Sequence, residues 1–369
     1  MRILLIGEYS NVHATLAAGL RKLGHEVCVV SDGDSWKNYP RDIDVSRTPG
    51  KLGGIKLMAK LWTLLPKMRD YDVVQLINPM FFELKAERLF FFYRYLRKHN
   101  KHVFLGAFGI DYYWVHTCTF DKPLRYSDFN IGAQVRNDAD ALREQRDWLG
   151  TTKEQLNKLI ANDCDGIITG LYEYQVCYQP AFPEKTRFIP FPITQHPSPI
   201  THHPSPITHH PSPITLFIGI SKNRSTYKGT DIMLKAAEAI AHTYPEQVTL
   251  QKAEGIPFDE YQQMIDDSDV LLDQLYSYTP AMNALLAMSK GIVVVGGGEP
   301  ENYEILGEKE LRPIINVEPT YESIYQELEQ LVLHPERLPE LKRQSIEYVQ
   351  KHHDYIKVAR QYLDFWTQK

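Results

Sequence analysis

The sequence predicts an α/β protein with two domains, each built on a parallel sheet, and three observations carry this prediction. Short apolar runs alternate with amphipathic helical segments from the first residue onwards. The chain has 369 residues, more than one ordinary hydrophobic core accommodates. The alternation stops at a Pro- and His-rich block and then resumes. We therefore place the first domain at residues 1–190, the block at 191–215 and the second domain at 216–354.

Composition excludes several classes of protein. Hydrophobic residues make up 43% of the chain, charged residues 24%, and the formal net charge is -5. This balance argues against nucleic acid as a partner, because no excess of positive charge is present to neutralise phosphates. The apolar runs are too short to span a bilayer, and the run Ile3–Ile6 is too short for a signal peptide. We therefore expect a cytoplasmic protein, with peripheral contact to a membrane as an open option.

The four cysteines predict neither a disulfide framework nor a metal site. Cys28, Cys118, Cys164 and Cys177 show no CxxC pair and no metal-like spacing, and they lie in or beside apolar stretches. Such cysteines are typical of reduced core residues. We expect no bound metal and no cofactor.

The first domain opens with a β-α-β unit. Met1–Gly7 forms an apolar strand, residues 12–23 carry apolar side chains at helical spacing, and Glu26–Val30 forms the next strand. The connection length is that of a parallel sheet. Gly7 stands alone where a dinucleotide fold would show GxGxxG, which disfavours NAD or FAD.

A basic helix is predicted after a loop over residues 32–54. Residues 55–68 carry leucines on one side, and lysines surround them. Such a helix either packs on the sheet with its lysines in water or lies on an anionic membrane surface, here the inner surface of the membrane. We favour the first reading at this stage.

The remaining elements of the first domain alternate in the same way. We predict strands at 72–77, 103–105, 165–169 and 187–191, and helices at 83–100 and within 138–163. Three tandem copies then follow, QHPSPIT once and HHPSPIT twice, over residues 195–215. Prolines at this density prohibit a helix, so we interpret the block as an extended linker or loop.

The second domain opens with a strand at 216–220, a basic loop and a helix from Thr230. Lys222, Arg224 and Lys228 are gathered in that loop, and Gly229 precedes the helix. Free N–H groups at a helix start, together with three cations, suit a phosphate or diphosphate. The alternative is an ordinary solvated basic loop. Further strands are predicted at 248–252, 270–273 and 292–295, a loop at 296–304, and helices at 258–266, 280–289, 322–333, 335–352 and 355–366.

Polar residues fall where strands of both domains end. In the first domain these are the loop Gly7–His13, with Ser10 and Asn11, and later Asn78 and Gly109–Asp111. They suit hydroxyl recognition or proton transfer. In the second domain they are the basic loop and the segments 276–283 and 296–304, whose Gly297 and Gly298 allow backbone to approach a ligand.

These segments together resemble the GT-B-fold glycosyltransferases called glycosyl transferases group 1, family 4. The strand 216–220 followed by SKNRSTYKGTDIMLKAAEAI resembles that family's strand, basic loop and KG-containing helix start. SDVLLDQLYSYTPAMNALLAMSKGIVVVGGGEPE is similar to its donor-site segment, and FGID occupies the place of its Gly-x-Asp motif. The resemblance implies two Rossmann-like parallel-sheet domains that face each other across a cleft, with the C-terminal helix 355–369 completing the first domain.

The resemblance also implies roles for individual residues. Lys222, Arg224, Lys228 and Gly229 would hold the donor's diphosphate, with Gly7, Gly297, Gly298, Glu299 and Glu301 beside the donor. Asp111 would be catalytic and face the acceptor or the reacting sugar; the alternative is that it caps the turn before Tyr112. His13 is a second catalytic candidate or a polar residue of the helix start, and Ser10, Asn11, Asn78 and Gly109 would meet the acceptor.

The sequence departs from the family at three places. Its paired glutamates would fall at Tyr278 and Leu286, its histidine before Gly-x-Asp at Phe108, and its N-terminal glycine-rich loop is reduced to Gly7. The expectation is a metal-independent glycosyltransferase that moves a sugar from a nucleotide-diphosphate donor to a glycan or lipid-linked acceptor, in surface polysaccharide or glycoconjugate synthesis. The alternative is a non-catalytic nucleotide-sugar-binding or scaffold protein of the same fold.

Overall fold

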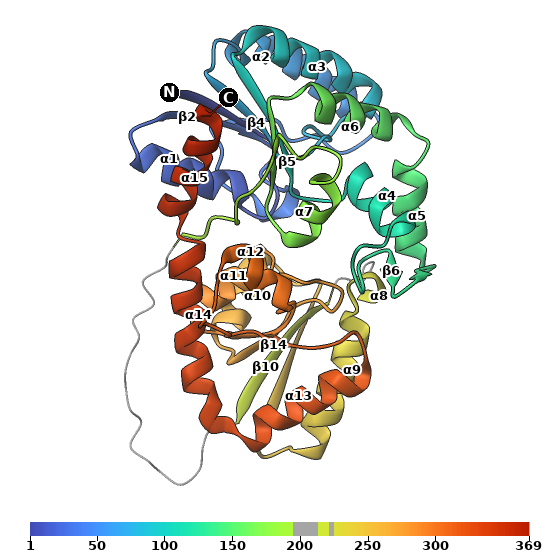
Figure 1. The fold of residues 1–369 in the computed structure, drawn as a ribbon, viewed down its shortest axis with the longest axis vertical. Coiled ribbons are helices and arrows are strands. Elements are labelled where there is room, and N and C mark those ends of the chain that lie inside the picture. Colours follow the sequence, from blue (N-terminus) through green and yellow to red (C-terminus); the bar gives the residue numbers. More distant parts are fainter. Residues whose placement is uncertain (195–212, 221–224, 369) are drawn as a thin grey trace. The chain divides into compact units, whose positions relative to one another are not determined.

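The computed structural model describes residues 1–194, 213–220 and 225–368 (Figure 1). The chain divides into two compact units. The first contains residues 1–125, 129–192 and 353–369, and the second contains residues 126–128 and 193–352. Each unit is built on its own parallel sheet, as the sequence predicted.

The sheet of the first unit has seven strands in the order β3-β2-β1-β4-β5-β8-β9, all parallel. Its inner strands are apolar on both faces, as expected where helices cover both sides of a parallel sheet. Their bounds are β1 Arg2–Ile6, β2 Glu26–Ser31, β3 Ile43–Asp44, β4 Val73–Leu76, β5 His102–Ala107, β8 Gly166–Thr169 and β9 Thr186–Phe188.

The helices of this unit follow its strands along the chain, and the last comes from the C-terminal end. They are α1 Val12–Lys22, α2 Gly53–Leu64, α3 Ala86–His99, α4 Tyr112–Phe120, α5 Ala139–Trp148, α6 Thr152–Asp163, α7 Tyr172–Tyr178 and α15 Tyr355–Thr367. Two 3₁₀ turns, η1 Ser35–Lys37 and η2 Leu65–Met68, and a small antiparallel pair, β6 Asn130–Ile131 with β7 Gln134–Val135, complete it.

Helix α15 is an integral part of the first unit. It packs on α1, and a Cβ added at Gly19 would lie 2.4 Å from the carbonyl oxygen of Tyr355. Phe365 and Trp366 contact Phe104 of β5, with ring centroids 5.6 and 6.1 Å apart. Burial of these two aromatic side chains, both less than 5% exposed, fastens the C-terminal helix to the sheet.

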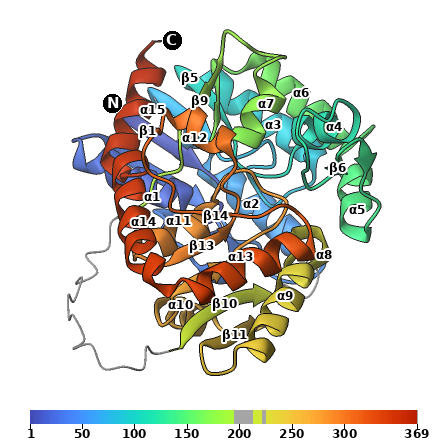
Figure 2. The same ribbon diagram turned by 60° about the horizontal axis from the view of Figure 1, so that its bottom comes forward.

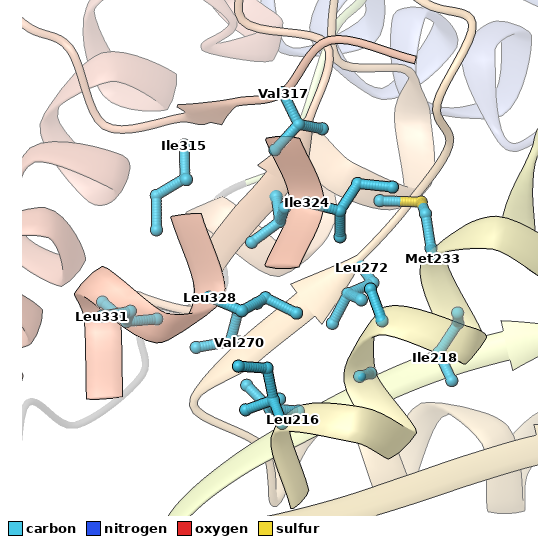
Figure 3. Packing of buried hydrophobic residues seen from close by; sticks show 14 of the residues in the cluster. Leu216, Ile218, Met233, Val270, Leu272, Ile315, Val317, Ile324, Leu328 and Leu331 are labelled. Atoms are coloured by element: carbon cyan, nitrogen blue, oxygen red, sulfur yellow. The ribbon is translucent and has the colours of Figure 1, made fainter. Parts of the chain in front are cut away.

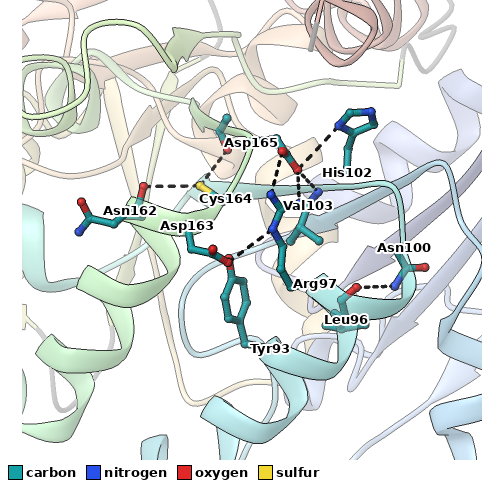
Figure 4. A network of polar contacts seen from close by, with 12 residues as sticks. Tyr93, Leu96, Arg97, Asn100, His102, Val103, Asn162, Asp163, Cys164 and Asp165 are labelled. Atoms are coloured by element: carbon teal, nitrogen blue, oxygen red, sulfur yellow. Dashed lines mark hydrogen bonds and ion pairs between the residues drawn. The ribbon is translucent and has the colours of Figure 1, made fainter.

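A polar network holds α3 against the strand β8 (Figure 4). Arg97 donates two hydrogen bonds to Asp165, at 2.7 and 3.1 Å, and Tyr93 donates one to Asp163 at 2.7 Å. Asp165 also accepts from the backbone N–H of Val103 at 2.7 Å. A bidentate guanidinium–carboxylate pair fixes direction as well as distance, so this network sets the angle of α3 on the sheet.

The sheet of the second unit has five parallel strands in the order β11-β10-β12-β13-β14. Their bounds are β10 Ile214–Ile220, β11 Val248–Glu254, β12 Val270–Leu272, β13 Val293–Gly296 and β14 Ile315–Asn316. The helices are α8 Ser225–Lys228, α9 Thr230–Thr243, α10 Phe258–Asp266, α11 Met282–Ser289, α12 Pro300–Leu306, α13 Tyr321–Leu333 and α14 Leu338–His352, with a 3₁₀ turn η3 Pro335–Arg337.

The core of the second unit lies between its sheet and the helix pair α9 and α13, which lie beside each other over β10 (Figure 2). Leu216 and Ile218 of β10 and Val270 of β12 point toward Leu328 and Ile324 of α13 (Figure 3). All five side chains are at most 1% exposed. This core anchors the strand whose carboxyl end begins the basic loop.

Two features of the sequence prediction are corrected. Residues 300–304, the second half of the predicted loop 296–304, belong to helix α12. The start signals were present: Pro300 occupies the first helical position, Glu301 the first turn, and Gly307 ends the helix. The helical stretch 138–163 is two helices, interrupted at 149–151. Helices α4 and α7 were not predicted, because α4 is apolar on nearly every side and α7 is short.

Candidate functional site

Both sheets reverse their strand order at one point, and ligands of open parallel sheets bind beside the carboxyl ends of the strands at such a point. In the first unit the order reverses between β1 and β4, and in the second between β10 and β12. Most of the residues singled out from the sequence lie at one or the other of these two carboxyl edges.

At the first edge, the connections after β1 and β2 are joined by one carboxylate. Asp34 accepts hydrogen bonds from the backbone N–H of Ser10 at 2.8 Å and from the ammonium of Lys37 at 2.6 Å. Lys37 also donates to the hydroxyl of Ser10 at 3.3 Å. The sequence prediction included Ser10 but treated Asp34 and Lys37 as loop residues.

The same two connections hold non-glycine residues in left-handed conformations. The φ angles are 51° at Ser10, 72° at Asn11, 59° at Asp34, 60° at Ser35 and 51° at Asn38. L-residues rarely adopt this region, and such residues concentrate at functional sites, where surrounding structure imposes the conformation. Hydrogen bonds such as that from the Ser10 N–H to Asp34 therefore hold the backbone of this edge in an uncommon conformation.

The start of α1 is already capped by a carboxyl group of the chain itself. Glu8, 2% exposed, accepts from the backbone N–H groups of His13 at 3.2 Å and Ala14 at 2.8 Å. Burial raises the pKa of Glu8 to about 8, although these hydrogen bonds oppose the shift. The N–H groups that a helix start offers to a phosphate are thus satisfied internally at α1.

His13 is a neutral, fully buried imidazole. Its Nδ1–H donates to the carbonyl oxygen of Gly7 at 2.8 Å, and its ring meets the ring of Phe108 edge-on at 6.4 Å. Nε2 has no hydrogen-bond partner among the described residues. Burial lowers the pKa of His13 to about 3, against the opposing hydrogen bond to Gly7. An imidazole of that pKa is a weak base, so its catalytic role stays a prediction from sequence.

Asp111 is a helix cap with both carboxylate oxygens engaged. Oδ1 accepts from the backbone N–H of Trp114 at 2.9 Å and Oδ2 accepts from the hydroxyl of Tyr178 at 2.7 Å. Tyr178 in turn accepts from Asn157, whose Oδ1 accepts from the N–H of Tyr112 at 2.9 Å. Asp111 is fully buried, and this burial raises its pKa to about 7. The geometry matches the capping alternative, and the catalytic role is a prediction that the geometry does not require.

Asn78, Gly109 and Gly7 are held by packing at the same edge. Asn78 is fully buried, donates to the carbonyl of Ile110 at 3.3 Å and accepts from the N–H of Met80 at 3.0 Å. A Cβ at Gly109 would lie 2.9 Å from the ring of Tyr9. Gly7 has φ of 84°, and a Cβ there would lie 2.3 Å from Ile77. These residues shape the edge through their neighbours.

At the second edge, the chain enters α9 through a residue that must be glycine. Gly229 has φ of 72°, and a Cβ there would lie 2.6 Å from the Cβ of Leu275. The backbone carbonyl of Lys228 accepts from the N–H of Leu275 at 2.9 Å. Lys228 is the last residue of α8, a helix of four residues that comes directly before Gly229 and α9.

The carboxylate of Asp273, which follows β12, is near enough to Lys228 for their charges to interact. Burial raises the pKa of Asp273, and the positive charge of Lys228 and a hydrogen bond from Asn283 oppose that shift. Asn283 also donates to the hydroxyl of Tyr261 at 3.2 Å. The ammonium of Lys228 is thus a positive point charge that stands close to a carboxylate at this edge. Asn283 ends the segment 276–283 that the sequence had indicated. Asp273 and Tyr261 were missed in the sequence, although Asp273 was the last residue of a predicted strand.

The glycine-rich segment after β13 packs closely within its own unit. A Cβ at Gly297 would lie 2.7 Å from the carbonyl oxygen of Ser277, and one at Gly298 would lie 2.8 Å from Ile314. Glu299 is the residue directly before α12, and its carboxylate accepts a hydrogen bond from the hydroxyl of Tyr126. Glu301 lies in the first turn of α12. The close approach predicted for these glycines is made within the protein itself, by backbone at Gly297 and by a side chain at Gly298.

Two of the predicted cations, Lys222 and Arg224, lie outside the described residues, as does most of the repeat block. No group of three or more His, Cys, Asp or Glu side chains placed to hold a metal ion occurs within the described ranges. None of the described helices combines the length and apolar character needed to cross a bilayer.

No model of a known protein family matches the sequence, and a search of curated proteins gives no match. Solved structures do match. Sucrose-phosphate synthase from Thermosynechococcus elongatus has a TM-score of 0.64 at 15% identity, over 100% of this chain and 98% of that chain. HepE of Anabaena, solved with UDP and glucose, has a TM-score of 0.60 at 12% identity over 100% of both chains. UDP-GlcNAc 2-epimerase from Neisseria meningitidis, bound to UDP-GlcNAc, has 0.55 at 11% over 100% of both chains.

These matches cover the whole chain, and they show that the protein has the GT-B fold. The sequence-based prediction of that fold, with its two Rossmann-like parallel sheets, is confirmed. At 11–15% identity the matches establish the fold alone.

Proposed function

We propose that the protein is a glycosyltransferase that takes a sugar from a nucleotide-diphosphate donor and transfers it to a glycan or lipid-linked acceptor. The observation that carries the proposal is the edge of the second unit. There, Lys228, the start of α9 after Gly229 and the carboxylate of Asp273 come together at the point of strand reversal. This is where an open parallel sheet binds its ligand.

The chemistry of the transfer explains why a fixed cation is needed there. When the glycosidic bond to the donor breaks, negative charge develops on the leaving diphosphate. Lys228 supplies a positive charge at a set position, and the N–H groups at the start of α9 supply further donors. Lys222 and Arg224 of the same loop would add to this charge. In the proposal these cations do the work that a metal ion does in other transferases.

Two of the similar structures favour a uridine diphosphate sugar as the first donor to test. HepE was also solved with UDP-glucose, and the epimerase was solved with UDP-GlcNAc. On the acceptor side, we propose that Ser10, Asn11, Asn78 and Gly109 form the floor on which the acceptor's hydroxyl groups lie. Asp34 and Lys37 set the backbone of that floor.

A second candidate is a nucleotide-sugar-binding protein without transfer activity. Tyr278 and Leu286 stand where the family resemblance places two glutamates, and Tyr278 is 1% exposed. Both carboxylate oxygens of Asp111 already accept hydrogen bonds inside the protein, from Trp114 and Tyr178. Both candidates require donor binding, and only the first requires donor turnover.

Turnover therefore separates the two. Purified protein would be incubated with UDP-glucose, UDP-galactose and UDP-GlcNAc, and release of UDP followed by chromatography with and without simple glycoside acceptors. The proposal predicts UDP release with at least one donor, and loss of most of it in Lys228→Ala. Lys235→Ala, which changes an exposed lysine of the following helix α9, serves as the matched control. Donor binding without any UDP release would favour the binding protein.

A further inference from the structure

Helix α2 stands in a segment with a marked charge imbalance. Residues 45–69 contain no Asp or Glu, while the whole chain carries a net charge of -5. The segment holds six cations, Arg47, Lys51, Lys56, Lys60, Lys67 and Arg69. The strongly basic character of this segment therefore contrasts with the acidic remainder of the chain.

The apolar side chains of α2 form two stripes, and only one of them is used for packing. Leu57 and Leu61 lie on the inner stripe and are at most 2% exposed. Leu52, Ile55 and Trp62 follow a second helical spacing, and they are 62%, 66% and 51% exposed. The inner stripe accounts for the attachment of α2 to its unit, so the outer stripe needs another explanation.

The outer stripe continues onto the neighbouring helix α3, which lies beside α2 (Figure 1). The rings of Trp62 and Phe91 are stacked, with centroids 4.5 Å apart and an angle of 26° between their planes. Phe91 is itself 42% exposed. Four large apolar side chains from two helices thus form one exposed patch, larger than the isolated surface residues that soluble proteins normally carry.

Lysines run beside this patch on α2 and the turn that follows it. Lys56 and Lys60 are one turn apart, and Lys67 lies in η2; all three are exposed. Lys60 reaches Asp44 at the long distance of 3.5 Å. For Lys51, Lys56 and Lys67, no carboxylate lies within ion-pair distance in the described part of the chain.

We propose that this surface, Leu52, Ile55, Trp62 and Phe91 with the adjacent lysines, binds the face of an anionic phospholipid bilayer. Helix α2 lies in the plane of the interface, the apolar stripe enters the boundary between headgroups and acyl chains, and the lysines meet lipid phosphates. Tryptophan and lysine suit this role, because the indole favours the interface and the lysine ammonium reaches outward from its apolar stem. A protein partner is the weaker explanation, since protein interfaces are depleted in lysine.

The test is binding of the full-length protein to vesicles, measured by co-sedimentation. One set of vesicles contains phosphatidylcholine alone, and the other contains phosphatidylcholine mixed with phosphatidylglycerol. The protein binds the mixed vesicles and binds those of phosphatidylcholine alone far more weakly. Binding falls as salt is raised, because the lysines act at the exposed surface.

Two sets of variants separate the apolar and basic contributions. The triple variant Lys51→Gln/Lys56→Gln/Lys67→Gln loses on the order of a hundredfold in affinity, since each cation near an anionic surface contributes about 1 kcal/mol. The double variant Ile55→Ser/Trp62→Ser loses binding to both vesicle types. Phe120→Ser is the matched control, because Phe120 is 58% exposed on the same unit but outside the patch, and it binds as the parent does. Circular dichroism melting establishes that each variant is folded.

Several outcomes overturn the proposal. Equal binding to both vesicle types, or undiminished binding by the triple lysine variant, excludes recognition of anionic lipid. Absence of binding to any vesicle excludes a membrane role. A dimer seen by size-exclusion chromatography and abolished in Ile55→Ser/Trp62→Ser, without vesicle binding, assigns the patch to self-association instead.

Discussion

Replacing Asp111 tests whether the carboxylate after β5 acts as a buried cap. In Asp111→Ala, helix α4 loses the side-chain acceptor for the N–H of Trp114, a loss that costs about 1 kcal/mol. The hydroxyl of Tyr178 loses its acceptor inside the protein, at a further cost of roughly 1–3 kcal/mol. The sum, about 2–4 kcal/mol, corresponds to a fall in melting temperature of roughly 5–15 °C for a domain of this size.

The variant Asp111→Asn tests the same cap through the pH dependence of folding stability. Burial raises the pKa of Asp111 from 3.8 to about 7. Because the folded-state pKa is above the unfolded value, this group's contribution to stability is fully present below the unfolded pKa and is lost as pH rises through about 7. Asparagine cannot ionise, yet its Oδ1 still caps Trp114. The stability of the variant relative to the parent should therefore rise between about pH 4 and pH 8, by up to about 4 kcal/mol.

The assays are urea unfolding across that pH range and hydrogen–deuterium exchange of the amides of α4, residues 112–120. Asp111→Ala should accelerate exchange in α4, while Asp111→Asn should leave it near the parent value at acidic pH. A flat difference between Asp111→Asn and the parent across the whole range would refute the buried-cap reasoning. So would full loss of donor turnover in Asp111→Asn with α4 unchanged, which would assign Asp111 to catalysis.

Three further predictions concern the two units. Glu308→Gln, which removes a fully buried carboxylate from Lys351 and His352 of α14, should destabilise the protein by roughly 2–3 kcal/mol at pH 7 in urea unfolding. Burial raises the pKa of Glu308, but its hydrogen bonds outweigh this and lower it. Its contribution is therefore present above pH 4.5 and lost as pH falls, and an equal effect at acidic pH would contradict this. Gly229→Ala should cost more than Gly255→Ala in melting temperature, because both have positive φ but only the first would bring a Cβ within 2.6 Å of Leu275. Trp366→Ala should lower stability by roughly 3–5 kcal/mol, and a negligible change would show that α15 is not part of the first unit's core.

The fold was predictable because its signals are periodic and local. The strand Ile3–Ile6, the helical spacing after Val12 and the resumption of the pattern at Leu216 each report burial on a sheet face or helix face. Helix α4 was not predicted because it is buried on nearly every side. Its sequence therefore shows no alternation of polar and apolar residues at helical spacing. Helix α12 was not predicted because the three glycines before it are typical of a loop, although Pro300 follows them as a signal for a helix start.

The candidate site was predictable only where its residues are neighbours in the sequence, within the one connection that follows a strand. Lys228 and Gly229 were found because cation, glycine and helix start coincide in sequence. Asp34 and Asp273 were not, because each acquires its role through a partner from another connection, Ser10 in one case and Lys228 in the other. A carboxylate has no local signal that tells whether it will accept from its own helix or face a ligand.

The most direct test of the central claim is whether the second unit's edge binds a nucleotide diphosphate. Melting temperature would be measured with UDP, UDP-glucose, UDP-GlcNAc, GDP-mannose and uridine, for the parent protein and Lys228→Ala. The account predicts that at least one nucleotide-diphosphate ligand raises the melting temperature, by an amount that grows with ligand concentration, that uridine does not, and that Lys228→Ala loses most of the increase. No stabilisation by any of these ligands, or an equal increase in Lys228→Ala, would contradict it.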